Sequence, residues 1–327
     1  MYLIGIDLGG TKCAVSLGSF NEGLPAIAHK CKPYPTKNYS PDAMLQLLAE
    51  DVAACIAMAG DELPAAIGIS CGGPLDSRRG LILSPPNMPD WDKVPVKEYF
   101  EKRFSIPCRL CNDANAGALA EWKWGAGAGC DNMVFMTFGT GLGAGMILGG
   151  KLYEGASDMA GEVGHIRLAA YGPSGYGKAG SFEGFCSGGG IAQLAATMIR
   201  AERQAGKRVG FWAGGRLPEE VTAADVGKAA AEGDPLAEKI LAECGSYLGQ
   251  GLSLLIDILN PDRIVLGSIF MRCRQWLWPA AKQVIDIETL PETNRACTVL
   301  PGSLGESIGD YAALAVALCC AEEQWLL

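Results

Sequence analysis

The sequence has little histidine, no surplus of positive charge and no long apolar run. Its 327 residues include 27 Lys and Arg against 36 Asp and Glu, a formal net charge of −9. No basic cluster interrupts this acidity, so we do not expect a nucleic-acid partner, because phosphate backbones are bound by concentrated Lys and Arg. The apolar run Tyr311–Ala321 is far shorter than the roughly 20 residues that span a bilayer. No basic region precedes an apolar stretch at the N-terminus, so neither a membrane anchor nor an export signal is expected.

The composition is that of a large folded protein. Hydrophobic residues make up 49% of the chain and charged residues 19%, which predicts a buried core rather than disorder. At roughly 100 to 200 residues per domain, the length predicts two domains. The thirteen cysteines are scattered, which favours reduced thiols and a cytoplasmic protein. Cys108 and Cys111 form a C-x-x-C pair, but without a second pair or a nearby histidine a strand is favoured over a redox or metal site.

Strands and helices alternate along the chain, and one strand pattern occurs twice. Leu3–Asp7 meets a glycine turn and resumes as Cys13–Leu17, and Met133–Phe138 meets a second turn and resumes as Ala144–Leu148. The repeated hairpin predicts an internal duplication, and the alternation predicts the α/β class. The other main predicted strands and helices are Pro41–Ala59, Ala65–Ser70, Val96–Phe104, Ile191–Gln204, Asp234–Leu259, Arg263–Leu266 and Asp310–Glu323. No low-complexity linker separates the halves, and we place the domain boundary near residue 116.

The first glycine turn is a candidate phosphate and magnesium site. Asp7 stands at the end of a strand, and Gly9, Gly10 and Thr11 follow in the turn. Backbone amides without side chains approach a phosphate closely, and a carboxylate is able to hold magnesium through water. Glycine turns also close many ordinary hairpins, which leaves a structural role open. The second turn, at 139–143, favours the functional interpretation, because two such loops are able to grip a polyphosphate from two sides.

Asn112 and Asp113 follow the predicted strand Pro107–Cys111, a position that opens onto the ligand crevice in parallel α/β sheets. In phosphoryl transfer to an alcohol, a carboxylate beside the hydroxyl accepts its proton as the new bond forms. Asp113 is therefore a candidate catalytic base. Its alternative role is structural, as the N-cap of a helix that starts at Ala114. The residues alone leave both roles open.

Glu162, His165 and Glu183 form a second candidate group. His165 is one of only two histidines in the chain. It is either a buried, hydrogen-bonded side chain or part of a ligand site. Two carboxylates and an imidazole suit a sugar, whose hydroxyls each need donors and acceptors when they leave water. A protein-held zinc is disfavoured, because the stretch Tyr171–Ser181 supplies neither a thiolate nor a second imidazole.

Seven segments spread over nearly the whole chain form an ordered set. They are I-G-I-D-L-G-G-T-K at 4–12, Gly73–Asp76, Ser84–Trp91, Cys111–Asn115, Gly139–Gly145, Glu154–His165 and Leu259–Gly267. In this order they resemble the ROK family of sugar kinases, repressors and related open reading frames. An ordered set of this kind is far more specific than any single motif in it.

The resemblance implies an actin-like ATPase fold of the ribonuclease H-like type, with two duplicated α/β domains around a central cleft. The domains are expected at 1–115, completed by a returning C-terminal helix at 310–327, and at 116–309. Asp113 is implied as the catalytic base. The residues implied to bind the sugar are Gly73, Asn112, Asp113, Glu162, His165 and Glu183. The residues implied to hold the phosphates, the adenosine and magnesium are Asp7, Gly9, Gly10, Thr11, Lys12, Thr140, Gly141 and Gly267.

One departure from the family pattern concerns zinc. Many members carry a C-x-C-G-x-x-G-C-x-E cluster after the histidine, and here Ser174, Tyr176 and Ser181 stand at the three cysteine positions. The glycines and Glu183 remain, so the loop is expected to keep its path and to present Glu183 without a structural zinc. A milder departure is Ser268, where the family commonly continues with glycine.

The sequence therefore predicts an ATP-dependent sugar kinase that phosphorylates the 6-hydroxyl of a hexose, with glucose as first choice. An N-acetylhexosamine, fructose or a β-glucoside is the alternative acceptor. Magnesium is expected to arrive with ATP, and a homodimer is usual among such relatives. A sugar-responsive regulator is the rival class. It is disfavoured because the first strand begins at Leu3, which leaves no room ahead of it for a helix-turn-helix, and because the chain is acidic.

Overall fold

The chain forms two compact units. The computed structural model describes residues 1–21, 23–212 and 215–325. Unit 1 consists of Met1–Asp131, Gly145–Ala160 and Ser303–Leu327, and unit 2 consists of Asn132–Ala144 and Gly161–Gly302. Within the described ranges, none of the helices combines the length and apolarity that crossing a bilayer requires.

The core of unit 1 is a twisted mixed sheet with the strand order β3-β2-β1-β5-β9, in which β4 also pairs with β2. The first two strands form an antiparallel hairpin, and β1, β5 and β9 run parallel. The strands of this sheet are β1 (Tyr2–Leu8), β2 (Lys12–Ser19), β3 (Ala26–Lys30), β4 (Tyr34–Pro35), β5 (Ile67–Cys71) and β9 (Cys108–Asn112). A small antiparallel sheet is formed by β6 (Leu75–Asp76), β7 (Leu81–Leu83) and β8 (Asp92–Val94).

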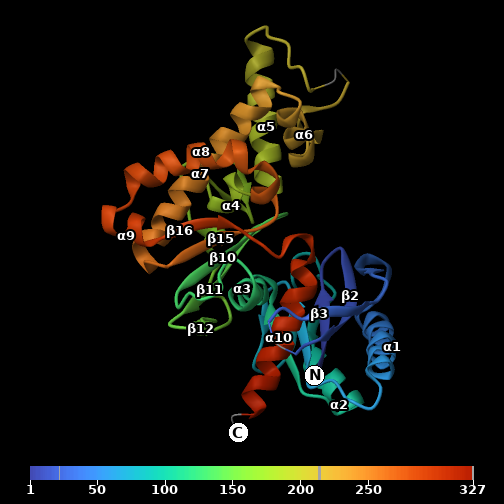
Figure 1. The fold of residues 1–327 in the computed structure, drawn as a ribbon. Helices are drawn as coiled ribbons and strands as arrows, with labels where there is room; N and C mark the ends of the chain where they lie inside the picture. Colours follow the sequence, from blue (N-terminus) through green and yellow to red (C-terminus); the bar gives the residue numbers. More distant parts are fainter. Residues whose placement is uncertain (22, 213–214, 326–327) are drawn as a thin grey trace. The chain divides into compact units, whose positions relative to one another are not determined.

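Helices cover both faces of this sheet (Figure 1). Alternation along β1 separates the faces: Ile4 and Ile6 belong to one hydrophobic cluster, and Leu3 belongs to another. The helices of the unit are α1 (Pro41–Ala59), α2 (Val96–Phe104), α3 (Asp113–Trp124) and α10 (Ile308–Trp325). The red helix α10 packs on β1 and β5. A Cβ at Gly68 would lie 2.1 Å from the Ala313 carbonyl oxygen, so only glycine lets α10 approach β5 this closely.

Unit 2 is built around a sheet of the same kind. Its strand order is β12-β11-β10-β15-β16, and β10, β15 and β16 run parallel. The strands are β10 (Met133–Phe138), β11 (Leu142–Leu148), β12 (Lys151–Leu152), β15 (Arg263–Leu266) and β16 (Thr298–Pro301), with a separate hairpin of β13 (Ser174–Gly175) and β14 (Lys178–Ala179). In both main sheets a hairpin leads into two further parallel strands. The shared order supports the duplication predicted from the two glycine turns.

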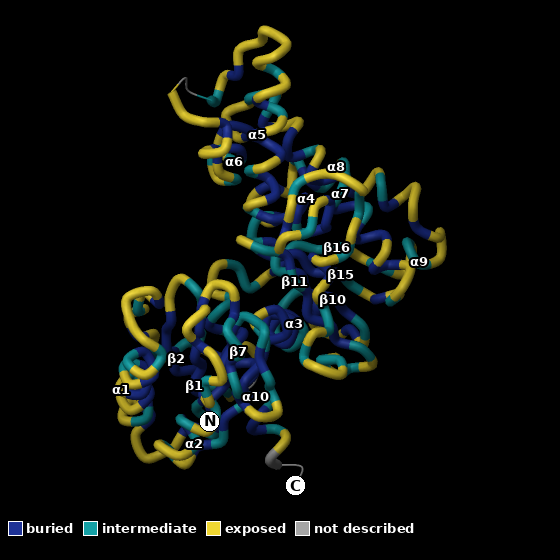
Figure 2. Tube along the Cα trace, turned by 180° about the vertical axis from the view of Figure 1, so that it is seen from behind, coloured by how far each residue is buried: buried dark blue, intermediate teal, exposed yellow. Residues whose placement is uncertain are grey.

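In the described part of unit 2, six α-helices accompany this second sheet. They are α4 (Phe182–Phe185), α5 (Gly188–Gln204), α6 (Ala223–Ala231), α7 (Pro235–Leu259), α8 (Ile269–Glu288) and α9 (Pro291–Ala296). The pair α7 and α8 packs closely, because a Cβ at Gly245 would lie 2.3 Å from the Leu277 carbonyl oxygen. Figure 2 shows the strands β10 and β15 as buried, in agreement with fully buried residues such as Val134 and Val265.

The division into units differs from the predicted boundary near residue 116. Helix α3 belongs to unit 1, because it packs against α10 and because the buried Glu121 at its end binds the chain that returns. The Glu121 carboxylate accepts hydrogen bonds from the backbone N–H groups of Ala126, Ser303 and Leu304, at 2.7, 3.0 and 3.1 Å. The predicted return of the C-terminal helix to the first half of the chain agrees with this division.

Most predicted elements have the expected type and place. The helices over 41–59 and 96–104 and the strand over 263–266 have the predicted bounds. The prediction missed α8, whose interior Pro279 is a residue that usually ends a helix. It also missed the short strands β6, β7, β13 and β14.

Candidate active site

The carboxyl ends of the parallel strands in unit 1 lie at one edge. The register pairs Leu8 with Cys71 and Cys71 with Asn112, so the residues that follow these three strands leave the sheet side by side. A Cβ at Gly72 would lie 3.9 Å from Oδ2 of Asp113. A Cβ at Gly73 would lie 3.3 Å from Nδ2 of Asn112. The structure therefore brings together the predicted residues Gly73, Asn112 and Asp113.

The turn between β1 and β2 requires glycine. The Gly9 N–H donates to the Lys12 carbonyl at 3.1 Å, and a Cβ at Gly10 would lie 2.4 Å from the Cβ of Asn87. The Thr36 hydroxyl donates to the Gly9 carbonyl at 2.6 Å and fixes the turn from outside. Thr11 and Lys12 at its tip are exposed, where backbone amides and an ammonium group are accessible to a phosphate.

Asn112, and not Asp113, is the N-cap of α3. Its Oδ1 accepts from the Ala114 and Asn115 N–H groups at 3.0 and 3.4 Å. The helix starts at Asp113, so the alternative in which Asp113 caps a helix from Ala114 is wrong. Asp113 is exposed, and its Oδ1 also accepts from the Ala114 N–H at 2.8 Å. Oδ2 is the carboxylate oxygen that faces Gly72.

Carboxylates are crowded at this edge. Burial, followed by the charges of Asp113 and Asp310, raises the pKa of Asp7 to about 6, although Lys12 and Lys30 act in the opposite direction. Asp113 is accessible to solvent, but the protein atoms around its carboxylate desolvate it and raise its pKa above the ordinary value, against the lowering effect of the backbone hydrogen bonds it accepts. Such crowding favours a bound cation, which would lower the pKa of Asp7 and restore its charge. The donor set of Asp7, with carboxylate oxygens only, fits magnesium.

The same edge includes an ion pair that the sequence did not indicate. Lys30 Nζ, at the end of β3, lies 2.5 Å from Oδ2 of Asp310 in the first turn of α10. The neighbouring Gly309 is close enough to Asp7 that a Cβ there would lie 3.2 Å from its Oδ2. The two partners are 280 residues apart, so no local pattern could have revealed the pair.

The second glycine turn, in unit 2, is joined to Glu183. Oε2 of Glu183 accepts from the Leu142 N–H at 3.0 Å, and a Cβ at Gly141 would lie 2.7 Å from the same oxygen. The Gly139 N–H donates to the Gly141 carbonyl at 3.0 Å. Thr140 is exposed at the tip. The structure thus brings together three predicted residues, Thr140, Gly141 and Glu183.

Glu162 and His165 lie close to this turn. The short 3-10 helix Val163–His165 packs against it, since a Cβ at Gly164 would lie 2.1 Å from the Leu142 carbonyl oxygen and 3.2 Å from the Cβ of Glu183. Glu162 and His165 are both exposed. A buried, hydrogen-bonded His165, the structural alternative, is therefore wrong. The imidazole instead meets the ring of Tyr176 edge-on, with centroids 6.2 Å apart and an angle of 77°.

Polar and aromatic contacts hold the loop at Ser174, Tyr176 and Ser181, the positions at which the sequence departs from the zinc-binding pattern. The Ser181 hydroxyl accepts from the Gly175 and Gly184 N–H groups at 3.2 and 3.1 Å. The side chain of Gln193 binds the backbone of Ser174 twice, at 2.9 Å each. With hydroxyl and phenol groups in place of thiolates, these residues do not fit a structural zinc. Within the described part of the chain, no three His, Cys, Asp or Glu side chains are grouped so as to hold a metal ion.

Gly267, predicted for the nucleotide side, follows β15. Its N–H donates to the Met136 carbonyl at 3.0 Å, and a Cβ there would lie 3.4 Å from the Phe135 ring. Ser268 comes next with φ 55° and ψ −112°, a conformation that favours glycine. The backbone at Ser268 is therefore strained, and glycine would relieve the strain.

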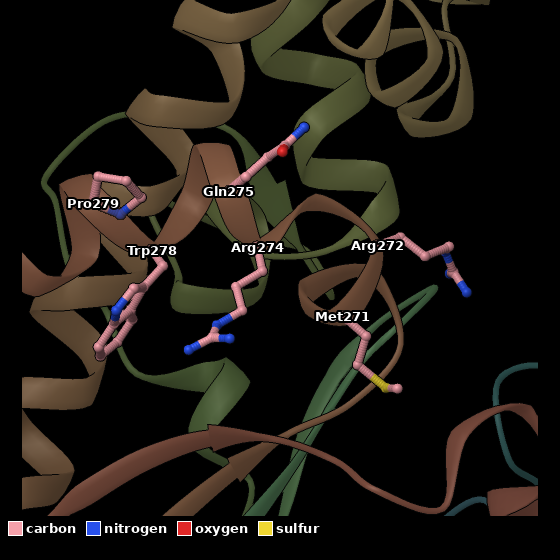
Figure 3. A pocket seen from close by; sticks show the side chains of 6 residues that line it. All are labelled: Met271, Arg272, Arg274, Gln275, Trp278 and Pro279. Carbon is pink, nitrogen blue, oxygen red and sulfur yellow. The ribbon is translucent and has the colours of Figure 1, made fainter.

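A hollow of about 480 Å³ surrounds the exposed side of α8. Figure 3 shows that Arg274 and Trp278 project from one side of the helix and Gln275 from the other. Because its lining side chains diverge, the hollow lacks the convergent polar groups of a ligand site.

The cysteines behave as core residues. All thirteen, each within the described ranges, are free thiols. Burial raises the pKa of both Cys108 and Cys111, and both lie in β9, as the strand interpretation predicted. Neither is a reactive thiolate at neutral pH.

Comparison with known proteins assigns the chain to a family. The model of the ROK family matches residues 3–318. The chain belongs to the ROK family. It is similar to a glucokinase from Streptomyces coelicolor, 34% identical over 266 residues that cover 81% of each chain. It is also similar to the structure of a ROK family glucokinase from Streptomyces griseus in complex with glucose and AMPPNP. That structure has a TM-score of 0.76 and 29% identity, with coverage of 98% of this chain and 100% of that one.

The fold is accordingly the actin-like ATPase fold that the resemblance implied, and similarity to glucokinases supports a sugar kinase. The family also contains regulators. The DNA-binding transcriptional dual regulator NagC of Escherichia coli is 26% identical over 317 residues, which cover 95% of this chain and 74% of that protein.

Proposed function

We propose that this protein transfers the γ-phosphoryl group of ATP to the 6-hydroxyl of a hexose, with glucose as the first-choice acceptor. The observation that carries the proposal is the position of Asp113. Its carboxylate stands at the carboxyl-end edge of three parallel strands, faces Gly72 with one oxygen and has a pKa that desolvation by the surrounding protein raises. A base with a raised pKa accepts a hydroxyl proton more readily near neutral pH.

In the proposed step, Asp113 accepts the proton of the 6-hydroxyl while that oxygen bonds to the γ-phosphorus and the bond to the ADP oxygen breaks. The amide Nδ2 of Asn112 and the backbone of Gly73 are the acceptor's further ligands in unit 1. Oδ1 of Asn112 serves as the α3 cap, so only its amide group is available to donate to the sugar. Because Oδ1 and Nδ2 of Asn112 have different partners, the orientation of the side-chain amide is fixed.

Glu162, His165 and Glu183 are the proposed ligands of the remaining hydroxyls. Glu162 and His165 are exposed, so both side chains are accessible to an acceptor. Oε2 of Glu183 is held by the Leu142 N–H, which leaves Oε1 to accept from a hydroxyl. Thr140 and Gly141 are assigned to the phosphates, and Gly267 to the adenosine.

Magnesium belongs to the substrate, as the complex with ATP, and supplies charge neutralisation of the phosphates. Asp7 is the residue that would hold it through water. Lys12, at the tip of the first turn, is the proposed partner of a phosphate oxygen.

The deciding experiment is ADP release with Mg-ATP across free hexoses, N-acetylhexosamines, fructose and β-glucosides, compared by kcat/KM. Sugar-dependent release that the Asp113→Asn variant loses supports the kinase. Sugar binding without ADP release from any acceptor overturns it and favours the second candidate, a regulator related to NagC.

A further inference from the structure

The hairpin of β13 and β14 holds a tyrosine in a conformation that disfavours tyrosine. Gly175 pairs with Lys178 across the hairpin, so Tyr176 and Gly177 form its two-residue turn. Both have positive φ, 45° and 73°, which is the type I′ geometry that strongly prefers Asn-Gly. A non-glycine, non-asparagine residue with left-handed φ is strained, and strain of this kind concentrates at functional sites.

The hairpin is anchored on every side, so the Tyr176 backbone is rigidly placed. Gln193 binds both backbone groups of Ser174 at 2.9 Å. A Cβ at Gly175 would lie 2.7 Å from the Gly184 nitrogen and 2.8 Å from the Cβ of Glu183. Lys178 Nζ donates to the His165 carbonyl at 2.7 Å, which ties the hairpin to the segment that carries the proposed sugar ligand.

The ring that this strained turn presents is largely exposed. Tyr176 retains 73% of its accessible surface, and its ring stands at 77° to the exposed imidazole of His165. The two rings therefore form a corner, with the polar nitrogens of His165 on one side and an accessible aromatic face on the other. An aromatic face beside a few polar groups is the usual composition of a small-molecule site.

We propose that Tyr176 determines acceptor specificity by forming an aromatic subsite beside His165. The subsite takes the substituent of a glycoside, that is, an aglycone or a second sugar ring attached to the hexose that the clamp holds. A free hexose makes its hydroxyl contacts with His165 and leaves the ring of Tyr176 exposed, whereas a glycoside covers it. This inference rests on the proposed function for the identity of the sugar clamp.

The test compares free glucose with the α- and β-phenyl glucosides in three variants. Tyr176→Asn removes the ring and places the residue that the type I′ turn prefers, so the fold is retained. Tyr176→Phe keeps the ring. Tyr171→Asn is the matched control, because Tyr171 is 88% exposed and makes no ring contact with His165 among the described residues. Each is assayed for kcat/KM with Mg-ATP and, without nucleotide, for sugar affinity by titration calorimetry.

We expect Tyr176→Asn to lower kcat/KM and affinity for at least one phenyl glucoside by roughly tenfold, the size of one aromatic contact, and to leave glucose within about twofold. Tyr176→Phe and Tyr171→Asn should resemble the wild type. Equal losses for glucose and both glucosides would show that the ring only orients His165 and would overturn the subsite, as would no change at all. Sugar binding without phosphoryl transfer would overturn the proposed kinase activity but not the subsite. In that case the sugar affinities from calorimetry would still test the subsite. A wild-type chain that binds none of these sugars overturns both.

Discussion

The two units share a strand order but differ in what stands at the carboxyl ends of their parallel strands. Asp7 is the next-to-last residue of β1 in unit 1, and Thr137 is the next-to-last residue of β10 in unit 2. The Thr137 hydroxyl is used within the hairpin, where it accepts from the Gly143 N–H at 3.1 Å. The pKa of Asp7 is instead raised, first by burial and then by the charges of Asp113 and Asp310. The same topology therefore carries a carboxylate at this strand position in one unit and a hydroxyl in the other.

The difference shows that chemistry in this fold comes from residues added at strand ends, and not from the sheet. In unit 1 the sheet register sets Asp113 beside Gly72. In unit 2 the corresponding edge is covered by segments that follow later in the chain, and Glu183 from α4 binds the turn directly.

The largest expected effect is a loss of turnover, and it tests the acidic edge of unit 1. Asp113→Asn should lower kcat by about 10² to 10⁴, because an amide cannot accept the hydroxyl proton, while sugar affinity changes little. Steady-state kinetics and calorimetry measure the two quantities. Asn also retains an acceptor oxygen for the Ala114 N–H, so thermal stability should hold. Turnover within a few-fold of the wild type would contradict the assignment.

A second acid of unit 1 should affect stability and not chemistry. Glu121→Ala should lower the free energy of unfolding by about 3 kcal/mol, because it removes the buried carboxylate that accepts from the N–H groups of Ala126, Ser303 and Leu304. Glu121→Gln keeps one acceptor oxygen and should lose less. Urea unfolding followed by circular dichroism measures both. Equal stability of the alanine variant and the wild type would show that water replaces the carboxylate.

Substitutions of Asp7 and Thr137 should change the stability of the protein in opposite directions. Because the pKa of Asp7 in the folded chain is about 6, above its ordinary value of 3.8, the folded form binds the proton more strongly, and stability falls as pH rises from about 4 to 6. Asp7→Asn should therefore stabilise the protein without magnesium by about 2 kcal/mol at pH 7.5 and by nothing below pH 4, while activity is lost.

Thr137→Val is the matched control for this comparison, since it removes only the hydrogen bonds to Gly143. It should destabilise by about 1 kcal/mol at every pH. Thermal unfolding across pH 4 to 8 separates the two variants. Parallel pH profiles for both would mean that neither burial nor the neighbouring acids raise the pKa of Asp7.

The smallest effect concerns backbone strain in unit 2. Ser268→Gly should stabilise by about 1 kcal/mol, because the backbone at φ 55° and ψ −112° suits glycine. Ser268→Ala, which keeps the Cβ, should bring no gain. Differential scanning calorimetry measures both shifts in Tm. A gain in the alanine variant would assign the effect to the hydroxyl group instead.

Local patterns were sufficient for much of the fold. The glycine turns after β1 and β10, the Asn112–Asp113 pair at the end of β9 and the helix over 41–59 were all predicted from neighbouring residues. Helix α8 was missed because its packing on α7, through Gly245, overrides the helix-ending tendency of Pro279.

The sequence by itself determined the α/β class, the duplicated hairpins and the chemical groups available to the site, because hydrophobic period, turn residues and motif order act over short stretches of chain. Only the tertiary structure decided which acids meet. The pairing of Lys30 with Asp310, the crowding of Asp7 by Asp113, and the contact of Tyr176 with His165 depend on strand register and helix packing. These bring together residues that are up to 280 positions apart, and no local pattern specifies such distances.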